Sequence, residues 1–170
     1  MSAAVLSLGS NVGDRLGYLR RCLQGFAATV RAVSPVYSTE PWGGVEQGEF
    51  LNAVLLVDDD TVDAGEWLRR GRQQEAVAQR SREVHGEIHW GPRTLDVDVI
   101  TVDDVRRADP DLTLPHPHAH ERAFVLVPWL AAAPAAVLPG HGPVEQLVTR
   151  LPAAQRYGVR RRDDLVLVSR

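Results

Sequence analysis

Two aspartates one residue apart, Asp96 and Asp98, interrupt an apolar stretch over residues 95–102. Alternate side chains of a β-strand point to the same face. A strand here would therefore hold both carboxylates side by side, with Cα atoms roughly 6.6 Å apart. The opposite face would carry the apolar side chains of Leu95, Val97 and Val99. Paired carboxylates in such a strand are costly unless a cation or strong hydrogen-bond donors compensate them.

Magnesium fits this pair, because Mg²⁺ binds proteins through one or two carboxylates and fills its shell with water and phosphate oxygens. The pair can also bridge two ions about 4 Å apart, an arrangement that stabilises phosphoryl transfer. The alternative is a solvated strand face with salt-bridged aspartates, which the Asp-x-Asp tripeptide alone favours. The preceding Gly91-Pro92-Arg93 favours the metal, because a guanidinium group engages phosphate oxygens in pairs. The sequence thus predicts magnesium-dependent transfer of phosphoryl or pyrophosphoryl groups from a nucleotide.

A second cluster occupies residues 112–124. Its histidines alternate at His116, His118 and His120, which raises the alternative of a zinc site. Two prolines in this stretch predict a turn instead of a strand, so the three rings need not share a face. We expect His116 and Arg122 to contact phosphate and the other two histidines to be solvated.

The third candidate site combines the loop over residues 39–48 with Asn52 in the apolar strand that follows. A buried amide needs hydrogen-bond partners. Asn52 either reads the edge of a heterocycle or is a structural asparagine, and Phe124 either belongs to the core or stacks on a flat ligand. Neither the Walker motif nor the dinucleotide-binding glycine fingerprint is present, so side chains and metals must hold the nucleotide.

Periodicity predicts the elements that position these residues. Strands are expected over residues 3–8, 33–38, 50–57 and 95–102, with a closing edge strand over 165–168. Helices are expected over residues 16–30, capped by Asn11 or Asp14, from a cap at Thr61 to residue 79, and over 119–130 and 144–151. Interleaved helices and strands with short connections predict an α+β fold with a mainly antiparallel sheet. All 170 residues form one expected domain, 1–170.

Residues 80–89 are polar and aperiodic. We expect a mobile lid that carries Arg80 and Arg82 and closes over bound nucleotide. A solvated surface loop is the alternative.

The composition describes an ordinary globular protein, with 44% hydrophobic and 24% charged residues. Its net charge of −3 opposes a nucleic-acid-binding surface. The single cysteine, Cys22, fits a reducing compartment and is expected in the core. No apolar run is long enough to span a membrane, so a cytoplasmic location is expected.

Several motifs occur in the order seen in one known family. They are Gly9-Ser-Asn11, Tyr37-Ser-Thr-Glu-Pro41, Phe50-Leu-Asn52, the Trp-Gly-Pro-Arg-Thr-Leu-Asp-Val-Asp run over 90–98, Leu112-Thr-Leu-Pro-His116 and Arg122-Ala-Phe124. From about residue 5 to about residue 139 the chain resembles the 6-hydroxymethyl-7,8-dihydropterin pyrophosphokinases of folate biosynthesis. The run over 90–98 is the most specific of these motifs.

The resemblance implies a ferredoxin-like core and transfer of the β,γ-diphosphate of ATP to the hydroxymethyl oxygen of the pterin, leaving AMP. It implies that Asp96 and Asp98 bind two Mg²⁺ ions. It assigns phosphate neutralisation and catalysis to Arg80, Arg82 and Arg93. ATP contacts fall on Glu75, Trp90, Thr113, His116 and Arg122. Pterin contacts or loops closing over it fall on Asn11, Thr39, Trp42, Phe50, Asn52 and Phe124.

The implied partners are therefore ATP and the hydroxymethyl dihydropterin, with no nucleic acid and no membrane, and a monomer is expected. The competing hypothesis is a non-catalytic metal–nucleotide-binding module of the same fold. That hypothesis predicts loss of a metal ligand or of the phosphate-facing arginines, and all of them are present in the sequence.

Overall fold

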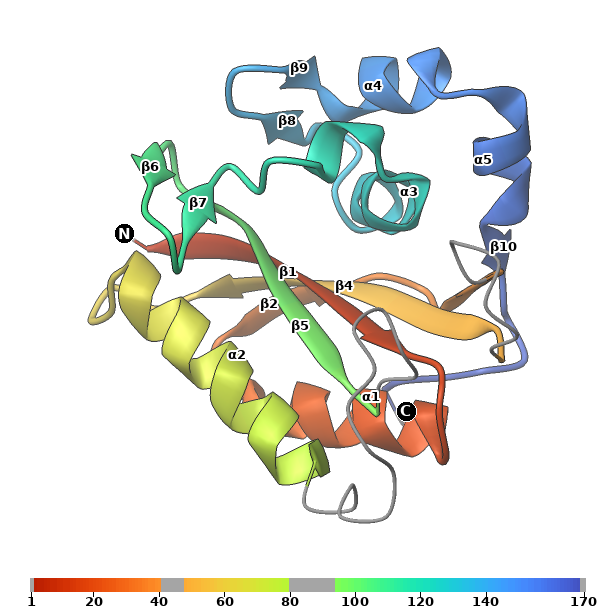
Figure 1. Cartoon of the computed structure of the whole chain (residues 1–170), viewed down its shortest axis with the longest axis horizontal. Coiled ribbons are helices and arrows are strands. Elements are labelled where there is room, and N and C mark those ends of the chain that lie inside the picture. The colour runs from red at the N-terminus through yellow and green to blue at the C-terminus, as the bar shows by residue number, and fades with distance from the viewer. Residues whose placement is uncertain (1, 41–47, 80–93, 169–170) are drawn as a thin grey trace.

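The structure, a computed structural model, describes residues 2–40, 48–79 and 94–168. In these ranges one sheet has the order β10-β3-β4-β1-β5, and β2 also pairs with β4 (Figure 1). Its strands are β1 Ala3–Ser10, β2 Val30–Val33, β3 Tyr37–Thr39, β4 Phe50–Asp58, β5 Asp96–Val102 and β10 Arg160–Arg161. Every pairing in it is antiparallel, which confirms the predicted kind of sheet.

Helices cover both faces of this sheet. They are α1 Arg15–Gly25, α2 Ala64–Gln79, the 3₁₀-helix η1 Ala119–Glu121, α3 Ala123–Ala132, α4 Val144–Arg150 and α5 Ala153–Gly158. In Figure 1, α1 and α2 lie against one face, and α3 lies against the other. Two small hairpins flank α3, made of β6 Arg107–Ala108 with β7 Thr113–Leu114, and of β8 Val137–Leu138 with β9 Gly142–Pro143.

Two apolar clusters result from the alternation along the strands. Leu6 and Leu8 of β1 pack with Trp67 of α2 on one face, and Cys22 is buried there as predicted. Val54 of β4 belongs to the cluster on the other face, which also contains residues of α3 and α4. Leu95, Val97 and Val99 all join the first cluster, which confirms that the aspartates between them face the other way.

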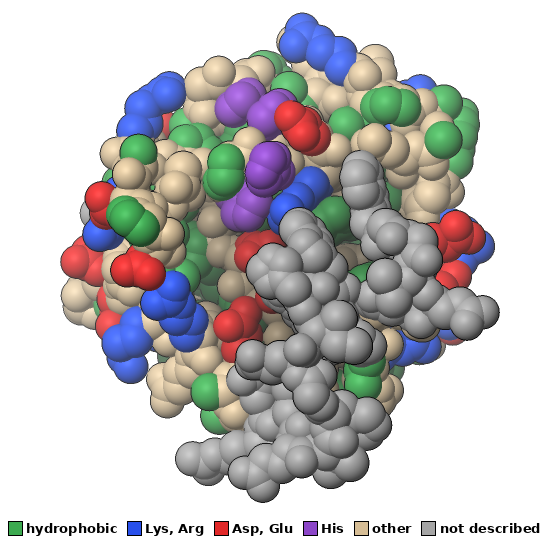
Figure 2. Space-filling model, viewed as in Figure 1, with side chains coloured by type: hydrophobic (Ala, Val, Ile, Leu, Met, Phe, Trp, Pro, Cys, Tyr) green, Lys and Arg blue, Asp and Glu red, His purple; other side chains and the backbone are tan. Residues whose placement is uncertain are grey.

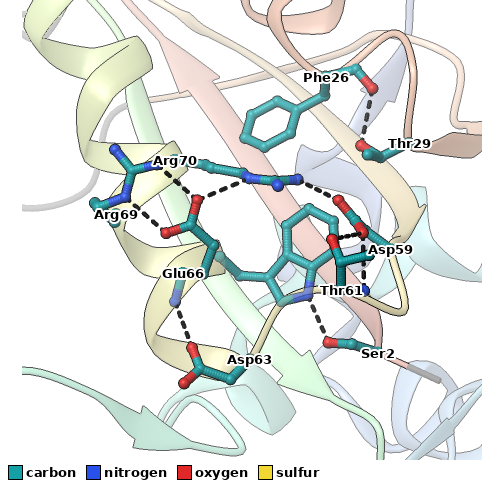
Figure 3. Close-up of polar contacts among 10 residues, drawn as sticks. Ser2, Phe26, Thr29, Asp59, Thr61, Asp63, Glu66, Arg69 and Arg70 are labelled. Atoms are coloured by element: carbon teal, nitrogen blue, oxygen red, sulfur yellow. Dashed lines mark hydrogen bonds and ion pairs between the residues drawn. The ribbon is translucent and has the colours of Figure 1, made fainter.

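The start of α2 is fixed by a polar network around a buried tryptophan (Figure 3). The Trp67 ring is fully buried, and its indole N–H donates to Ser2 Oγ at 2.9 Å. The Arg70 guanidinium lies over this ring, 5.2 Å from its centroid, and donates to both Glu66 and Asp59. Arg69 also donates to Glu66 through two nitrogens. The hydrogen bonds from Arg69, which have the largest effect, and from Arg70 lower the pKa of the Glu66 carboxyl to about 2.

The N-terminal cap of α2 differs from the prediction. Asp63 accepts the Glu66 backbone N–H at 2.8 Å, which satisfies one of the free amides of the first turn. Thr61, the predicted cap, lies in the preceding turn and donates its N–H and hydroxyl to Asp59. The cap of α1 is Asp14, one of the two predicted candidates, whose carboxylate accepts the Gly17 N–H at 3.0 Å.

Three predicted boundaries are wrong. The helix expected to reach residue 30 ends at Gly25, because Val30 begins β2. The strand expected over 33–38 is two strands, β2 and β3, since Pro35 between them has no N–H for a ladder. Residues 165–168 form no strand, and β10 is the edge strand instead.

The helix expected over 119–130 is broken in two at Arg122. This residue has φ −101° and ψ 102°, an extended conformation between η1 and α3. Among the described helices, none is long and apolar enough to cross a membrane.

Candidate active site

The two aspartates lie in cross-strand rows with small residues of β1. Asp96 is opposite Gly9, and Gly9 is opposite Asn52 of β4; in the next row, Asp98 is opposite Ser7. Residues directly opposite one another share a face of the sheet. Because neighbouring strands are about 4.8 Å apart, the backbones at Asp96 and Asn52 are separated by roughly 10 Å. The carboxylates of Asp96 and Asp98 and the side-chain amide of Asn52 thus lie on the same face of the sheet.

Two basic side chains approach Asp98 from the segment before α3. Arg122 Nη1 is 3.4 Å from Asp98 Oδ2, and His116 Nε2 is 4.0 Å from the same oxygen. The His116 backbone N–H donates to the Ile100 carbonyl of β5 at 2.8 Å, which holds this segment beside the strand. In the view of Figure 2, acidic, basic and histidine side chains meet near the middle of the visible molecular surface. The structure thus brings His116 and Arg122 together beside Asp98, and their predicted contact with phosphate stays a prediction.

His116 is a neutral imidazole near neutral pH. Burial, with smaller effects from Arg122 and His118, lowers its pKa to about 4. Its Nδ1 accepts the His118 backbone N–H at 3.2 Å, so the proton of the neutral ring is on Nε2. Its contact with Asp98 is therefore no ion pair, and the N–H at Nε2 points toward the carboxylate side of the site.

Arg122 connects the carboxylates to an aromatic ring. Its guanidinium carbon is 5.5 Å from the centroid of Phe124, within the range of a cation–π contact. Phe124 is only partly buried and packs against the second apolar cluster. The two alternatives left open for Phe124 are thus compatible, because a ring packed on the core at one side still has exposed surface.

Asn52 and Thr39, which the resemblance assigns to the pterin, are in direct contact. Asn52 Nδ2 donates to Thr39 Oγ1 at 2.8 Å, and both residues are buried. Gly9 lies against the amide oxygen, since a Cβ at Gly9 would be 3.4 Å from Asn52 Oδ1 and 3.7 Å from Phe50 Cδ1. Phe50 is half-buried at the first position of β4. These residues lie together on the face that carries Asp96.

Glu75 of α2 contacts β5, the strand that carries Asp96 and Asp98, directly. Its Oε1 accepts the Val97 backbone N–H at 2.8 Å, so this helix residue binds the strand between the two aspartates. Thr113 lies in β7 and is exposed, and its hydroxyl donates to the Asp109 carbonyl at 3.4 Å. Asn11 is buried just after β1.

Part of the predicted site lies outside the described residues. This applies to Arg80, Arg82, Trp90, Arg93 and Trp42, and to the lid expected over 80–89.

The described residues include donors of the kind that magnesium uses. In them, no group of three or more His, Cys, Asp and Glu side chains could hold a metal ion. His118 is exposed as expected, but His120 is half-buried and its ring stacks on that of His141 at 4.3 Å, which corrects the prediction of a solvated His120. Two half-buried carboxylates on one strand face provide the hard oxygen donors that Mg²⁺ uses, with water and phosphate supplying the rest.

Sequence reasoning missed two contributors, Ser7 and Gly71. Ser7 is buried opposite Asp98. The sequence pattern that could have revealed it is the row of small residues that alternate with leucines along β1. Gly71 lies in α2 against Val97, where a Cβ would be 3.1 Å from Val97 Cγ1. The sequence feature that could have revealed Gly71 is a glycine inside a predicted helix, one turn before Glu75.

A carboxylate pair beside a guanidinium and a neutral imidazole is typical of enzymes that transfer phosphate groups. Here it is built on a ferredoxin-like α+β sheet. The chain belongs to the 7,8-dihydro-6-hydroxymethylpterin-pyrophosphokinase (HPPK) family, whose family model matches residues 5–134.

Relatives that match most of the chain support this assignment. The 2-amino-4-hydroxy-6-hydroxymethyldihydropteridine pyrophosphokinase of Mycobacterium tuberculosis (strain H37Rv) is 48% identical over 172 residues, covering 94% of this chain and 89% of the relative. The protein of the same name from Mycobacterium leprae is 46% identical, with coverage of 94% and 88%. The one from Bacillus subtilis is 39% identical over 129 residues, or 74% of each chain. The predicted family and enzyme class are confirmed.

Solved structures confirm the fold. A Plasmodium falciparum HPPK-DHPS matches with a TM-score of 0.65 at 12% identity, covering 96% of this chain and 48% of that one. Another HPPK-DHPS, solved in complex with substrates, matches with a TM-score of 0.64 at 9% identity, covering 86% of this chain and 42% of that one. The present chain thus spans less than half of the length of these solved chains.

Proposed function

We propose that this protein transfers the β,γ-diphosphate of ATP to the hydroxymethyl oxygen of 6-hydroxymethyl-7,8-dihydropterin, giving AMP and the pterin diphosphate in tetrahydrofolate biosynthesis. The observation that carries the proposal is the single sheet face on which Asp96 lies across Gly9 from Asn52, with Asp98 in the next row opposite Ser7. Phosphate chemistry at one end and heterocycle recognition at the other are then adjacent. The relatives' shared name supports the same reaction.

We assign the nucleotide phosphates to the β5 side of the face. Asp96 and Asp98 would hold two Mg²⁺ ions, which neutralise phosphate charge when bound. Arg122 supplies a permanent positive charge 3.4 Å from Asp98, and the neutral His116 supplies an N–H donor there. A neutral donor binds a phosphate oxygen without competing with the cations for the carboxylates. Thr113 and Glu75 remain assigned to this side by family resemblance.

We assign the pterin to the β4 side. Asn52 already donates one amide hydrogen to Thr39, which fixes the orientation of the amide. Its remaining hydrogen and its oxygen can then pair with the edge of a heterocycle. Phe50 lies near this amide, and Phe124 lies beside Arg122; both are partly exposed and supply aromatic surface for a flat ring.

The remaining expectations extend this proposal. Arg80, Arg82 and Arg93 are expected to act on the phosphates, Trp90 to lie along the nucleotide, and Asn11 and Trp42 to close over the pterin. We also propose one domain over residues 1–170, supported by the packing of α4 and β10 on the core of the family-matched part. A monomer in the cytoplasm remains the expectation.

The direct test is mass detection of products after incubation with ATP, Mg²⁺ and the hydroxymethyl dihydropterin. Equal amounts of AMP and pterin diphosphate are expected, and omission of Mg²⁺ or of the pterin should abolish both. A variant in which Asp98 is replaced by Asn, with similar size and no charge, serves as the control for the metal site. Release of ADP, or of AMP without the pterin diphosphate, would contradict the proposed reaction.

A further inference from the structure

β5 lies at one edge of the described sheet, with β1 as its neighbour on the inner side. Backbone N–H groups on an outer edge have no strand to pair with, and an unpaired edge is less firmly held than an inner strand. The outer N–H of Val97 instead donates to Glu75 Oε1 at 2.8 Å. This amide belongs to the residue between Asp96 and Asp98, so the bond fixes the backbone that carries both carboxylates.

The bond depends on how closely α2 approaches β5. Gly71 is buried on the same face of α2, one turn before Glu75. A Cβ at Gly71 would be 3.1 Å from Val97 Cγ1, 3.5 Å from Val97 Cβ and 3.7 Å from the Val97 carbonyl oxygen. The absent side chain therefore lets the helix backbone pack directly on Val97, which brings Glu75 within hydrogen-bond distance of the strand.

We propose that Glu75 and Gly71 are positioning residues for the metal site: Glu75 binds the Val97 amide, and Gly71 lets α2 come close enough for that bond. The inference rests on the proposed function, since it concerns the placement of Asp96 and Asp98. It differs from the role in ATP contact that family resemblance gives Glu75, because the action of Glu75 passes through the strand backbone.

The chemistry of the bond gives the proposal a specific signature. A carboxylate is a strong acceptor for a backbone N–H, but a glutamine of the same length presents a carbonyl oxygen in the same place. If Glu75 acts by holding the amide, Glu75→Gln should restore most of what Glu75→Ala loses. If it acts through negative charge, on a cation or on the nucleotide, Glu75→Gln should be as defective as Glu75→Ala.

The first experiment compares Glu75→Ala, Glu75→Gln and, as a matched control on the exposed side of α2, Gln73→Ala. Hydrogen exchange of the Val97 amide is followed by NMR without ligands, and Mn²⁺ binding is followed by electron paramagnetic resonance with a non-hydrolysable ATP analogue. We expect Glu75→Ala to speed Val97 exchange and weaken Mn²⁺ binding, each by at least about tenfold. Glu75→Gln and Gln73→Ala should stay within about threefold of the parent protein.

The second experiment tests Gly71. Gly71→Ala adds a methyl group that Val97 must accommodate, and we expect faster exchange of the amide at position 97 and weaker Mn²⁺ binding. Val97→Ala removes the γ-methyl groups that this added methyl group would meet, so the double variant Gly71→Ala/Val97→Ala should recover protection relative to Gly71→Ala alone. Such recovery is a coupling between the two sites in a double-mutant cycle.

The proposal is overturned if Glu75→Ala leaves Val97 exchange unchanged, or if Glu75→Gln is as defective as Glu75→Ala. It is also overturned if the Gly71→Ala defect is not reduced by Val97→Ala. These readouts do not involve pterin turnover. A protein that shows the expected exchange and Mn²⁺ binding but makes no pterin diphosphate would refute the proposed function and leave the positioning role intact.

Discussion

Asp96 and Asp98 are half-buried carboxylates on one strand, and Arg122 Nη1 lies 3.4 Å from Asp98 Oδ2. We predict that Asp96→Ala and Asp98→Ala each lower Mg²⁺-dependent turnover by at least about 100-fold, or roughly 2.7 kcal/mol of barrier. The fold should persist, because loss of a carboxylate relieves repulsion in the metal-free protein. Steady-state rates across a Mg²⁺ titration measure the effect.

Asp104→Ala is the matched control, since Asp104 is exposed in the turn after β5. Its turnover should equal that of the parent protein. Rates within tenfold of the parent protein for both Asp96→Ala and Asp98→Ala would refute the metal site.

At the other end of the same face, Asn52 is 4% exposed and bonded to Thr39. We predict that Asn52→Ala weakens pterin binding by about 1–3 kcal/mol, the cost of leaving a polar edge unpaired in a buried site. ATP binding should change much less. Calorimetric titration of each ligand separately checks this, and equal losses for both ligands would mean that Asn52 is a structural residue.

Cys22 gives a prediction about pH. Burial, with a smaller effect of the Glu75 carboxylate, raises its pKa from 9.0 to about 12. Because the raised pKa disfavours the thiolate in the folded state, the native thiol should react with alkylating reagents far more slowly at pH 8 than the unfolded chain. The same shift lowers stability as the pH rises from about 9 to about 12, since the unfolded chain loses its proton first.

Labelling rates with and without denaturant measure the first effect. For the second, unfolding midpoints of the parent protein and Cys22→Ala are compared over this pH window, and the decline should be shallower in the variant. Native labelling as fast as that of unfolded protein would contradict the buried position.

At the scale of elements, the segment before α3 delivers the basic groups of the site. The extended conformation of Arg122 separates η1 from α3 and directs the chain past β5, while the His116 amide is bonded to the Ile100 carbonyl. A continuous helix over 119–130 would have placed Arg122 on a regular helical face. The break thus has a consequence for function, since Arg122 contacts both Asp98 and Phe124.

The helix that carries Glu75 begins with a side-chain cap at Asp63. We predict that Asp63→Ala lowers the free energy of unfolding by about 1 kcal/mol, the usual effect of removing an N-cap acceptor. Asp63→Asn retains an acceptor oxygen and should unfold like the parent protein. Urea denaturation of the two variants measures the difference. If both variants lose the same stability, charge near the helix terminus matters more than the hydrogen bond.

At the scale of the whole molecule, residues beyond the family match complete the structure. Val144 and Leu147 of α4 and Leu151 after it are buried in the second apolar cluster, and Leu167 is buried in the first. Arg20 of α1 donates twice to the Val166 carbonyl. Both apolar clusters therefore depend on this C-terminal part.

We predict that a chain ending at residue 134 does not unfold cooperatively, because the face of α3 that packs on α4 would be exposed to water. Differential scanning calorimetry of this chain and of the full chain checks the prediction. A sharp transition at a similar temperature for both chains would contradict it, and would separate the C-terminal part from the domain.

The sequence alone determined those features that depend on neighbouring residues. Alternation over 95–102 was enough to predict a strand with Asp96 and Asp98 on one face, because the side-chain period of a strand is local. Helical spacing predicted the buried face of α1, although its end was missed where Val30 enters β2. The motif run over 90–98 identified the family, since few proteins share so long a pattern.

Only the tertiary structure decided which distant residues meet. The row of Asp96, Gly9 and Asn52 depends on β1 lying between β5 and β4 in a fixed register, and register is set by packing across the whole sheet. The contact of Glu75 with Val97 requires α2 to pack on β5 at Gly71. Neither arrangement follows from local pattern, because each joins segments whose distance is set by the complete core.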